Sequence, residues 1–218
     1  MSAAKLFFAV LIFKVSEMML KHVSVSSLKL VKMFAGAALL IGIGALATSH
    51  AKAPLQTVDR IELDRYLGVW YEIARKPMYF QNKCDYDVTA TYTINENGNV
   101  QIVNRCFDKQ ANKHEAVAEG FVSNAPFNSQ LKVSFLPEAV RWIPIARGDY
   151  WILKIDEDYQ TVLVGEPGRR YLWILSRQPK LDQAVVKHYL DYAKLQGYDI
   201  SDLIYTQQGR SSSLEIQP

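Results

Sequence analysis

The chain has 218 residues, of which 49% are hydrophobic and 22% are charged, and its formal net charge is +3. Residues 1–53 hold six Lys and one Glu, a net charge of +5, whereas residues 54–218 hold 19 basic and 21 acidic residues, a net charge of −2. A region this near to neutral lacks the positive field that attracts nucleic acids or an anionic membrane. We therefore expect no nucleic-acid partner, and one domain of about 150 to 165 residues behind a basic leader.

The leader, residues 1–53, contains a 15-residue apolar stretch at 33–47 with lysines before it and small residues after it. This pattern predicts a secretory signal peptide, because the stretch falls short of the ~20 residues that a membrane-spanning helix needs. A signal peptide of ordinary length would place the translation start at Met18 or Met19. The alternative is a membrane anchor that includes the earlier apolar run at 6–13.

The remainder of the chain shows the period-2 alternation of half-buried strands, most clearly at 86–94, where Asn97-Gly98 then supplies a hairpin turn. If this turn is tight, Glu96 faces Asn99. Eight strands are predicted in hairpin order, at 68–76, 86–94, 99–107, 114–122, 129–136, 149–155, 159–165 and 170–177. Eight strands without intervening helices predict an all-β, up-and-down antiparallel barrel, which at this size can hold one small ligand.

Beyond the strands, the period changes to that of an amphipathic helix at 181–196, with Asp182 near its start and Gly197 just past its end. Residues 202–206 predict a short ninth strand. The barrel domain is therefore expected to span 54–208, and the polar residues 209–218 to form a disordered tail.

Three short elements carry a family resemblance: Gly68 and Trp70 at the start of the first strand, the Asp158-Tyr159 turn, and Arg177 at the end of the eighth strand. In these and in the longer runs 70–75, 131–135 and 171–177, the chain resembles the lipocalins, specifically the bacterial outer-membrane type. Many of those relatives carry a lipid on a Cys after the apolar leader. This sequence has no Cys there, so lipid anchoring is not expected.

The resemblance implies that Arg177 lies over Trp70 and closes the narrow end of the barrel, where Asp158 and Tyr159 shape a tight turn. It also implies a role in lipid carriage and envelope maintenance, and some relatives form homodimers. We expect a periplasmic or secreted protein that binds a fatty acid, a lysophospholipid or a similar amphiphile, with membrane-surface association left open.

Aromatic side chains offer the apolar area that such a ligand needs. The candidate ligand-binding residues lie on strands or on loops near the predicted open end: Tyr79, Tyr92, Phe135, Trp142, Tyr150, Trp151 and Trp173. Tyr150 and Trp151 must point to opposite faces of their strand. Arg141 and Arg147 in the loop 136–148 could bind an anionic head group, and the same loop could instead form a dimer contact or lie exposed.

Cys84 and Cys106 are the only cysteines, and in an exported chain they favour a disulfide. The tight hairpin places Thr89, not Cys84, opposite Cys106. A bulge or a bent loop must therefore bring the two Cα atoms within ~4.4–6.8 Å.

No catalytic, metal-binding or cofactor-binding motif is found, and His114 and His188 read as surface residues. We therefore expect a binding protein rather than an enzyme. Two alternatives stay open: a cavity enzyme that uses a free cysteine as its nucleophile, and a protein-interaction module whose barrel is filled by its own side chains.

Overall fold

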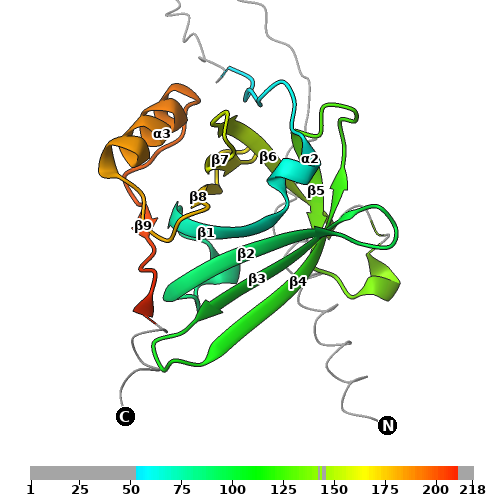
Figure 1. Cartoon of the computed structure of the whole chain (residues 1–218), viewed down its shortest axis with the longest axis horizontal. Helices are drawn as coiled ribbons and strands as arrows, with labels where there is room; N and C mark the ends of the chain where they lie inside the picture. The colour runs from blue at the N-terminus through cyan, green and yellow to red at the C-terminus, as the bar shows by residue number, and fades with distance from the viewer. Residues whose placement is uncertain (1–52, 142, 144–145, 211–218) are drawn as a thin grey trace, which may run out of the picture. The chain divides into compact units, whose positions relative to one another are not determined.

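The computed structural model describes residues 53–141, 143 and 146–210. The predicted leader up to residue 52, the candidate ligand residue Trp142 and the tail from residue 211 lie outside the described residues. The elements, labelled in Figure 1, are α2 (Leu63–Tyr66), β1 (Gly68–Arg75), η1 (Tyr79–Gln81), β2 (Tyr86–Ile94), β3 (Val100–Phe107), β4 (Lys113–Val122), β5 (Gln130–Ser134), η2 (Glu138–Val140), β6 (Gly148–Ile155), β7 (Thr161–Gly165), β8 (Leu172–Ser176), α3 (Gln183–Leu195) and β9 (Ile204–Tyr205).

The eight strands β1 to β8 form a closed antiparallel barrel, as the sequence predicts. Each strand pairs with the next along the chain, and β1 pairs with both β8 and β2, which closes the ring. The ninth strand, β9, pairs with the second half of β1, opposite Ala74 and Arg75. Gln208 then donates from its side chain to the main-chain oxygens of Glu72 and Val88 and so bridges β1 and β2.

The predicted register of the β2–β3 hairpin is wrong by one residue. Ile94 pairs with Val100 and Thr89 with Arg105, so the turn holds three residues instead of two. The side chain of Asn95 is the reason, because its Oδ1 accepts hydrogen bonds from the main-chain N–H groups of residues 97 and 99. Gly98 takes the positive φ, +77°, that such a three-residue turn requires.

The predicted disulfide is confirmed. The pairing of β2 with β3 shifts between Tyr86 and Thr89, where Asp87 has a φ of +49°. This bulge and the bent loop before it bring the Cα atoms of Cys84 and Cys106 to 5.4 Å, and the two sulfur atoms are bonded.

A second bulge lies in β1, between Glu72 and Ala74. Trp70 and Glu72 face the barrel interior, as the period of two predicts. Ile73 and Ala74 then both pack outward among the residues beneath α3, and Arg75 faces inward again, opposite Trp173 of β8. The bulge therefore places two oppositely charged side chains, Glu72 and Arg75, inside the barrel, and both are buried.

Helix α3 lies within the predicted range and packs on the outer face of the barrel (Figure 1). Asp182 caps it by accepting a hydrogen bond from the N–H of Ala184 at 2.7 Å, and Gly197 ends it with a φ of +84°. Its buried side chains include Tyr189 and Ala193, which pack over outward-facing residues of β6 to β8. Within the part of the chain that the structure describes, no helix has the length and apolar character to cross a membrane.

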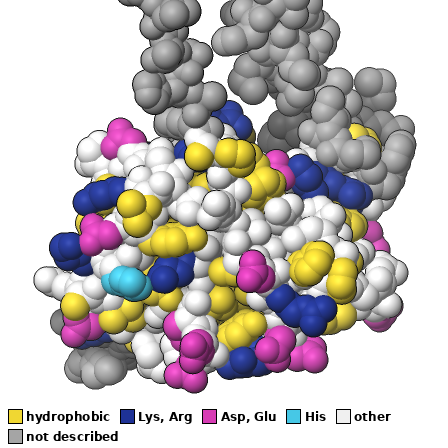
Figure 2. Space-filling view, turned by 90° about the horizontal axis from the view of Figure 1, so that it is seen from above, with side chains coloured by type: hydrophobic (Ala, Val, Ile, Leu, Met, Phe, Trp, Pro, Cys, Tyr) yellow, Lys and Arg dark blue, Asp and Glu magenta, His cyan; other side chains and the backbone are white. Residues whose placement is uncertain are grey.

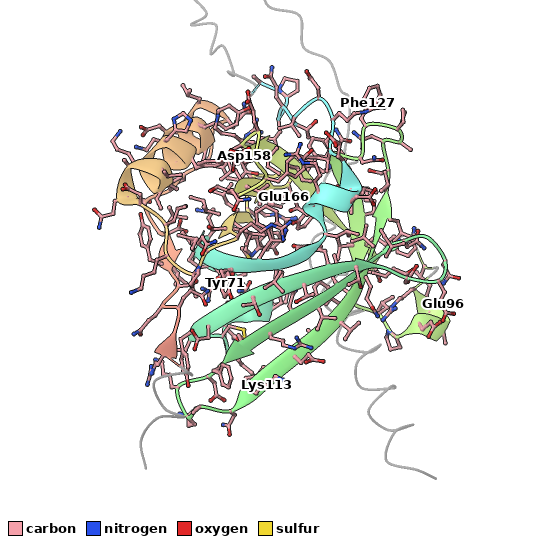
Figure 3. The ribbon with its side chains drawn as sticks, viewed as in Figure 1. Tyr71, Glu96, Lys113, Phe127, Asp158 and Glu166 are labelled. Carbon is pink, nitrogen blue, oxygen red and sulfur yellow. A yellow bond between two sulfur atoms is a disulfide. The ribbon has the colours of Figure 1, made fainter. Side chains whose placement is uncertain are left out.

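Strands β7 and β8 begin two residues later than predicted. Before β7, the carboxylate of Asp156 accepts hydrogen bonds from the N–H groups of Asp158, Gln160 and Thr161, which holds residues 156–160 in a turn. Figure 3 labels Asp158 in this turn and Glu96 in the β2–β3 turn. On the face seen in Figure 2, acidic, basic and apolar side chains are interspersed, in agreement with the near-neutral charge of residues 54–218.

Candidate ligand site

The two ends of the barrel differ in how they are covered. The lead-in to α2 crosses one end: the N–H of Ile61 donates to the carbonyl of Phe127 in the β4–β5 loop, and the N–H of Glu62 donates to the hydroxyl of Tyr159 in the β6–β7 turn. Arg65 also donates to the carbonyl of Glu157. This end is closed, so the opposite end, with the β1–β2, β3–β4 and β7–β8 loops, is the side from which a ligand can enter.

The predicted structural residues meet at the closed end. The guanidinium carbon of Arg177 lies 3.9 Å from the centroid of the Trp70 ring, as the family resemblance implies. The same guanidinium donates to the carbonyls of Arg65, Tyr66, Leu67 and Val69 at 2.7 to 3.1 Å. A single side chain therefore joins β8 to α2 and to the start of β1.

Gly68 is required at this junction for two reasons. Its φ is +96°, a conformation that other residues adopt only with strain, and a Cβ atom on it would lie 3.2 Å from a terminal nitrogen of Arg177. Tyr159 also has a positive φ, +57°, and its ring lies 4.2 Å below the guanidinium carbon of Arg65. Asp158 is exposed in the same turn.

Three tyrosines meet above this closed end, inside the barrel. Tyr66 of α2 packs against Trp70 and Tyr92, with ring centroids 5.2 and 5.3 Å apart. The hydroxyl of Tyr150 of β6 lies 2.6 Å from that of Tyr66 and 2.8 Å from that of Tyr92. We call Tyr66, Tyr92 and Tyr150 the tyrosine triad.

Burial keeps the triad protonated. It raises the pKa of Tyr66 and of Tyr150 well above the usual value of 10, and that of Tyr92 to about 12. At neutral pH all three side chains are therefore neutral phenols, each with one O–H to donate.

A second polar group lies higher in the interior, around Glu72. Its carboxylate accepts hydrogen bonds from Arg75 at 3.2 Å, from Gln81 at 2.6 Å and from Thr206 at 2.5 Å. Burial raises the pKa of Glu72, and the charge of Arg75 and these hydrogen bonds offset part of the rise. Gln81 also accepts from the indole N–H of Trp173 at 3.4 Å.

Aromatic rings continue from Trp173 to the open end. Tyr171 lies 6.3 Å from Trp173, and Phe80 lies 5.2 Å from Tyr171 and 5.3 Å from Tyr79. Phe80 is 50% exposed and Tyr79 is 78% exposed. Of the predicted ligand residues, the structure thus places Tyr92, Tyr150 and Trp173 inside the barrel and Tyr79 at its rim.

Accessible surface inside the barrel marks where a ligand can fit. Ile152, Val164, Trp173 and Arg75 pair across four neighbouring strands and so face the same side, the interior. Trp173 is only partly buried, and so is Tyr150, whose hydroxyl bonds fix it inside. Because their strands present these side chains inward, the surface they retain adjoins open space on the inner side.

The remaining predicted ligand residues lie elsewhere. Trp151 packs outward with the residues beneath α3, and Phe135 is 52% exposed beyond the end of β5. Arg141 pairs with Glu119 at 3.5 Å, and the guanidinium carbon of Arg147 lies 3.7 Å from the ring centroid of Phe121. The two arginines therefore bind groups of β4 and do not meet Tyr92 or Trp173.

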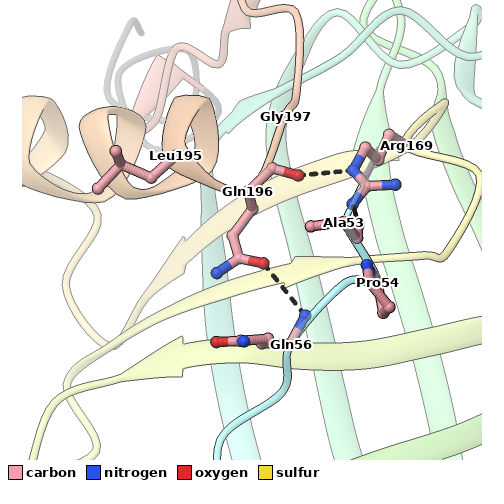
Figure 4. Close-up of a pocket in the computed structure, with 7 residues that line it drawn as sticks. All are labelled: Ala53, Pro54, Gln56, Arg169, Leu195, Gln196 and Gly197. Carbon is pink, nitrogen blue, oxygen red and sulfur yellow. Dashed lines mark hydrogen bonds between the residues drawn. The ribbon is translucent and has the colours of Figure 1, made fainter. Parts of the chain in front are cut away.

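Two depressions lie outside the barrel, both along α3. The pocket in Figure 4 lies between the end of α3 and the lead-in, where Arg169 donates to the carbonyl of Gln196 at 2.5 Å and Gln196 accepts from the N–H of Gln56 at 3.1 Å. A groove between α3 and the β9 segment is lined by apolar residues and by Lys180, Lys187 and others. Among the described residues, no cluster of acidic, His or Cys side chains could hold a metal ion.

Sequence reasoning missed Tyr66, Glu72, Arg75 and Gln81. Glu72 could have been found, because it shares the period-2 face of Trp70. Arg75 could not, since the bulge after Glu72 reverses the parity of the strand. Tyr66 comes from a single helical turn whose direction the sequence leaves open.

Comparison with known proteins agrees with this geometry. A profile of the lipocalin-like domain family matches residues 61–208. The chain is 40% identical to temperature-induced lipocalin-1 of Arabidopsis thaliana over 161 residues, which cover 72% of this chain and 84% of that protein. It is 30% identical to the outer membrane lipoprotein Blc of Escherichia coli K12, over 83% of this chain and 98% of that protein. Insecticyanin of the tobacco hornworm, Manduca sexta, shares the fold with a TM-score of 0.57 at 17% identity, over 72% of this chain and 86% of that one.

Proposed function

Because the chain belongs to the lipocalin family, whose members bind small hydrophobic ligands, we propose that it carries or stores an amphiphile such as a fatty acid or lysophospholipid. The observation that carries this proposal is the partly accessible, inward-facing surface of Tyr150 and Trp173, reached from an open end with aromatic residues at its rim. Burial of an acyl chain contributes about 0.8 kcal/mol per CH₂ before the costs of association, which is enough for micromolar affinity.

The test compares two tryptophans on opposite faces of the wall. Trp173→Leu removes an inward-facing ring and should weaken the binding of a long-chain fatty acid by roughly tenfold, about 1.4 kcal/mol. Trp151→Leu is the matched control, because Trp151 lies on the outer face. Affinities are measured by displacement of a fluorescent fatty acid. Equal losses in the two variants would show that the ligand does not enter the barrel.

The natural ligand is identified separately, by native mass spectrometry of protein purified without detergent, followed by organic extraction. A stoichiometric lipid would support the proposal and name the ligand class. An empty protein that also binds no fatty acid would favour the alternative of a filled barrel that acts as an interaction module.

We infer export from the cell from two features, the predicted leader and the bond between Cys84 and Cys106, since disulfides persist in oxidising compartments. The envelope role follows from similarity to the outer membrane lipoprotein Blc, and membrane-surface association and homodimer formation are extensions of it. N-terminal sequencing of the secreted protein tests the export proposal, and a mature chain that still carries residues 1–33 would contradict it.

The bonded cysteines also bear on the alternative of a cavity enzyme. The structure leaves neither Cys84 nor Cys106 as a free thiol, so the nucleophile that this alternative invokes is missing. We therefore propose equilibrium binding without a covalent step.

A further inference from the structure

The tyrosine triad has one more proton to donate than it has hydrogen bonds. Three phenols carry three O–H groups, whereas two bonds join them, both to Tyr150. Among the described residues, no other acceptor binds any of the three hydroxyls. One O–H is therefore directed at something that the chain itself does not supply, and a buried donor left without an acceptor costs about 1–3 kcal/mol.

Accessible surface indicates which hydroxyl holds the spare proton. Tyr66 and Tyr92 are each only 3% exposed, whereas Tyr150 is partly exposed toward the interior. If Tyr66 and Tyr92 both donate to Tyr150, each buried phenol is satisfied and the proton of Tyr150 points into the open space. Donation from two neighbours also polarises the central O–H and strengthens its own hydrogen bond.

The surroundings of the triad favour an uncharged acceptor. The charge of Arg177 acts on Tyr66 and Tyr92, but its guanidinium donates to main-chain carbonyls of the α2 segment. The other cation described in this part of the interior, Arg75, is paired with Glu72. A carboxylate brought to Tyr150 would lose its water without gaining a cation in contact, which is costly, whereas a carbonyl oxygen needs only the one donor.

We propose that Tyr150 donates a hydrogen bond to a neutral oxygen, such as a ketone or aldehyde carbonyl, at the inner end of a hydrophobic ligand, with Tyr66 and Tyr92 as donors to Tyr150. This inference rests on the proposed function, since it concerns the same cavity. It adds the orientation of the ligand, with the carbonyl toward the closed end and the hydrocarbon toward Trp173, and a preference for carbonyl compounds over hydrocarbons and carboxylates of equal length.

The test uses three probes of one chain length: 2-tridecanone labelled with ¹³C at its carbonyl, tridecane and tridecanoate. Affinities come from displacement of a bound fluorophore, and the carbonyl stretch of the bound ketone is read by isotope-edited infrared spectroscopy. The native protein should bind the ketone roughly three- to tenfold more tightly than tridecane, with a carbonyl band shifted to lower frequency by the hydrogen bond.

Tyr150→Phe should abolish both the preference and the shift while leaving the affinity for tridecane unchanged. Tyr205→Phe, a change at an exposed tyrosine of β9, is the matched control and should alter neither. If Tyr150→Phe does not fold, Tyr66→Phe and Tyr92→Phe each remove one supporting donor and should each reduce the frequency shift.

Three results would overturn the proposal: a bound ketone with the carbonyl frequency of a dry hydrocarbon, a shift that persists in Tyr150→Phe, or a Tyr150-dependent preference for tridecanoate. In each of these the cavity still binds, so the proposed function stands. If none of the three probes displaces the fluorophore, the proposed function fails along with the inference.

Discussion

Replacement of Arg177 by Ala should destabilise the barrel more than the loss of any ordinary surface charge. Arg177 is the side chain that joins the end of β8 to Trp70 and to the carbonyls of Arg65, Tyr66, Leu67 and Val69. Truncation removes the stacked cation and leaves these carbonyls to water or without a partner.

The magnitude follows from the contacts. A cation stacked on an indole contributes about 0.5–2 kcal/mol. Two of the hydrogen bonds, to the carbonyls of Tyr66 and Leu67, are partly buried, and a net contribution of about 1 kcal/mol each is reasonable. The other two are exposed and add less. The sum is about 3 kcal/mol, which for a domain of this size lowers the melting temperature by roughly 6–12 °C.

Urea unfolding, followed by tryptophan fluorescence, measures this loss. Arg177→Lys keeps the charge but cannot span four carbonyls, so it should recover about half of the stability. Arg60→Ala, at an exposed arginine of the lead-in, is the control for loss of a positive charge. A difference of less than about 0.5 kcal/mol between Arg177→Ala and Arg60→Ala would refute the reasoning, because it would mean that the closed end is held by apolar packing alone.

Replacement of both Cys84 and Cys106 by Ala opens a loop with a sequence separation of 22 and should cost roughly 2–4 kcal/mol in urea unfolding, with no loss if reduced protein is compared. The raised pKa of Glu72 means that the folded state binds its proton more tightly, so stability relative to Glu72→Gln should fall as pH rises above 4.5; a constant difference would contradict this. The hydrogen bond from His114 lowers the pKa of Asp108 to about 2, so an NMR titration should return it toward 3.8 in His114→Ala, and the stabilisation from this pair should disappear as pH falls through about 2.

The sequence predicts the barrel well because the alternation of apolar and polar residues is regular where strands pair without interruption. It fails where a single polar side chain decides the geometry. The turn after β2 contains the expected Asn97-Gly98, yet Asn95 captures two N–H groups and lengthens the turn by one residue. Nothing in the alternation of β2 and β3 reports such a local competition.

The candidate site shows the same division. Tyr92 and Trp173 were predicted as ligand residues, and their strands carry them inward. Tyr150 and Trp151 are neighbours of similar character, and only the pairing of Tyr150 with Leu131 and its bonds to the triad reveal that Tyr150 is the inner one. For Arg141 and Arg147 the sequence offers charge in a loop, whereas their orientation depends on Glu119 and Phe121, which lie some twenty residues away.

The closed end and the proposed ligand site are physically connected through Tyr66. Its carbonyl accepts from the indole N–H of Trp70 and from Arg177, and its hydroxyl reaches Tyr150. The residues of the family motif therefore fix the position of one member of the tyrosine triad as well as closing the barrel. Loss of Arg177 should consequently reduce the carbonyl shift of a bound ketone even at temperatures where the variant stays folded, whereas the cysteine replacements, at the other end of β3, should leave that shift unchanged.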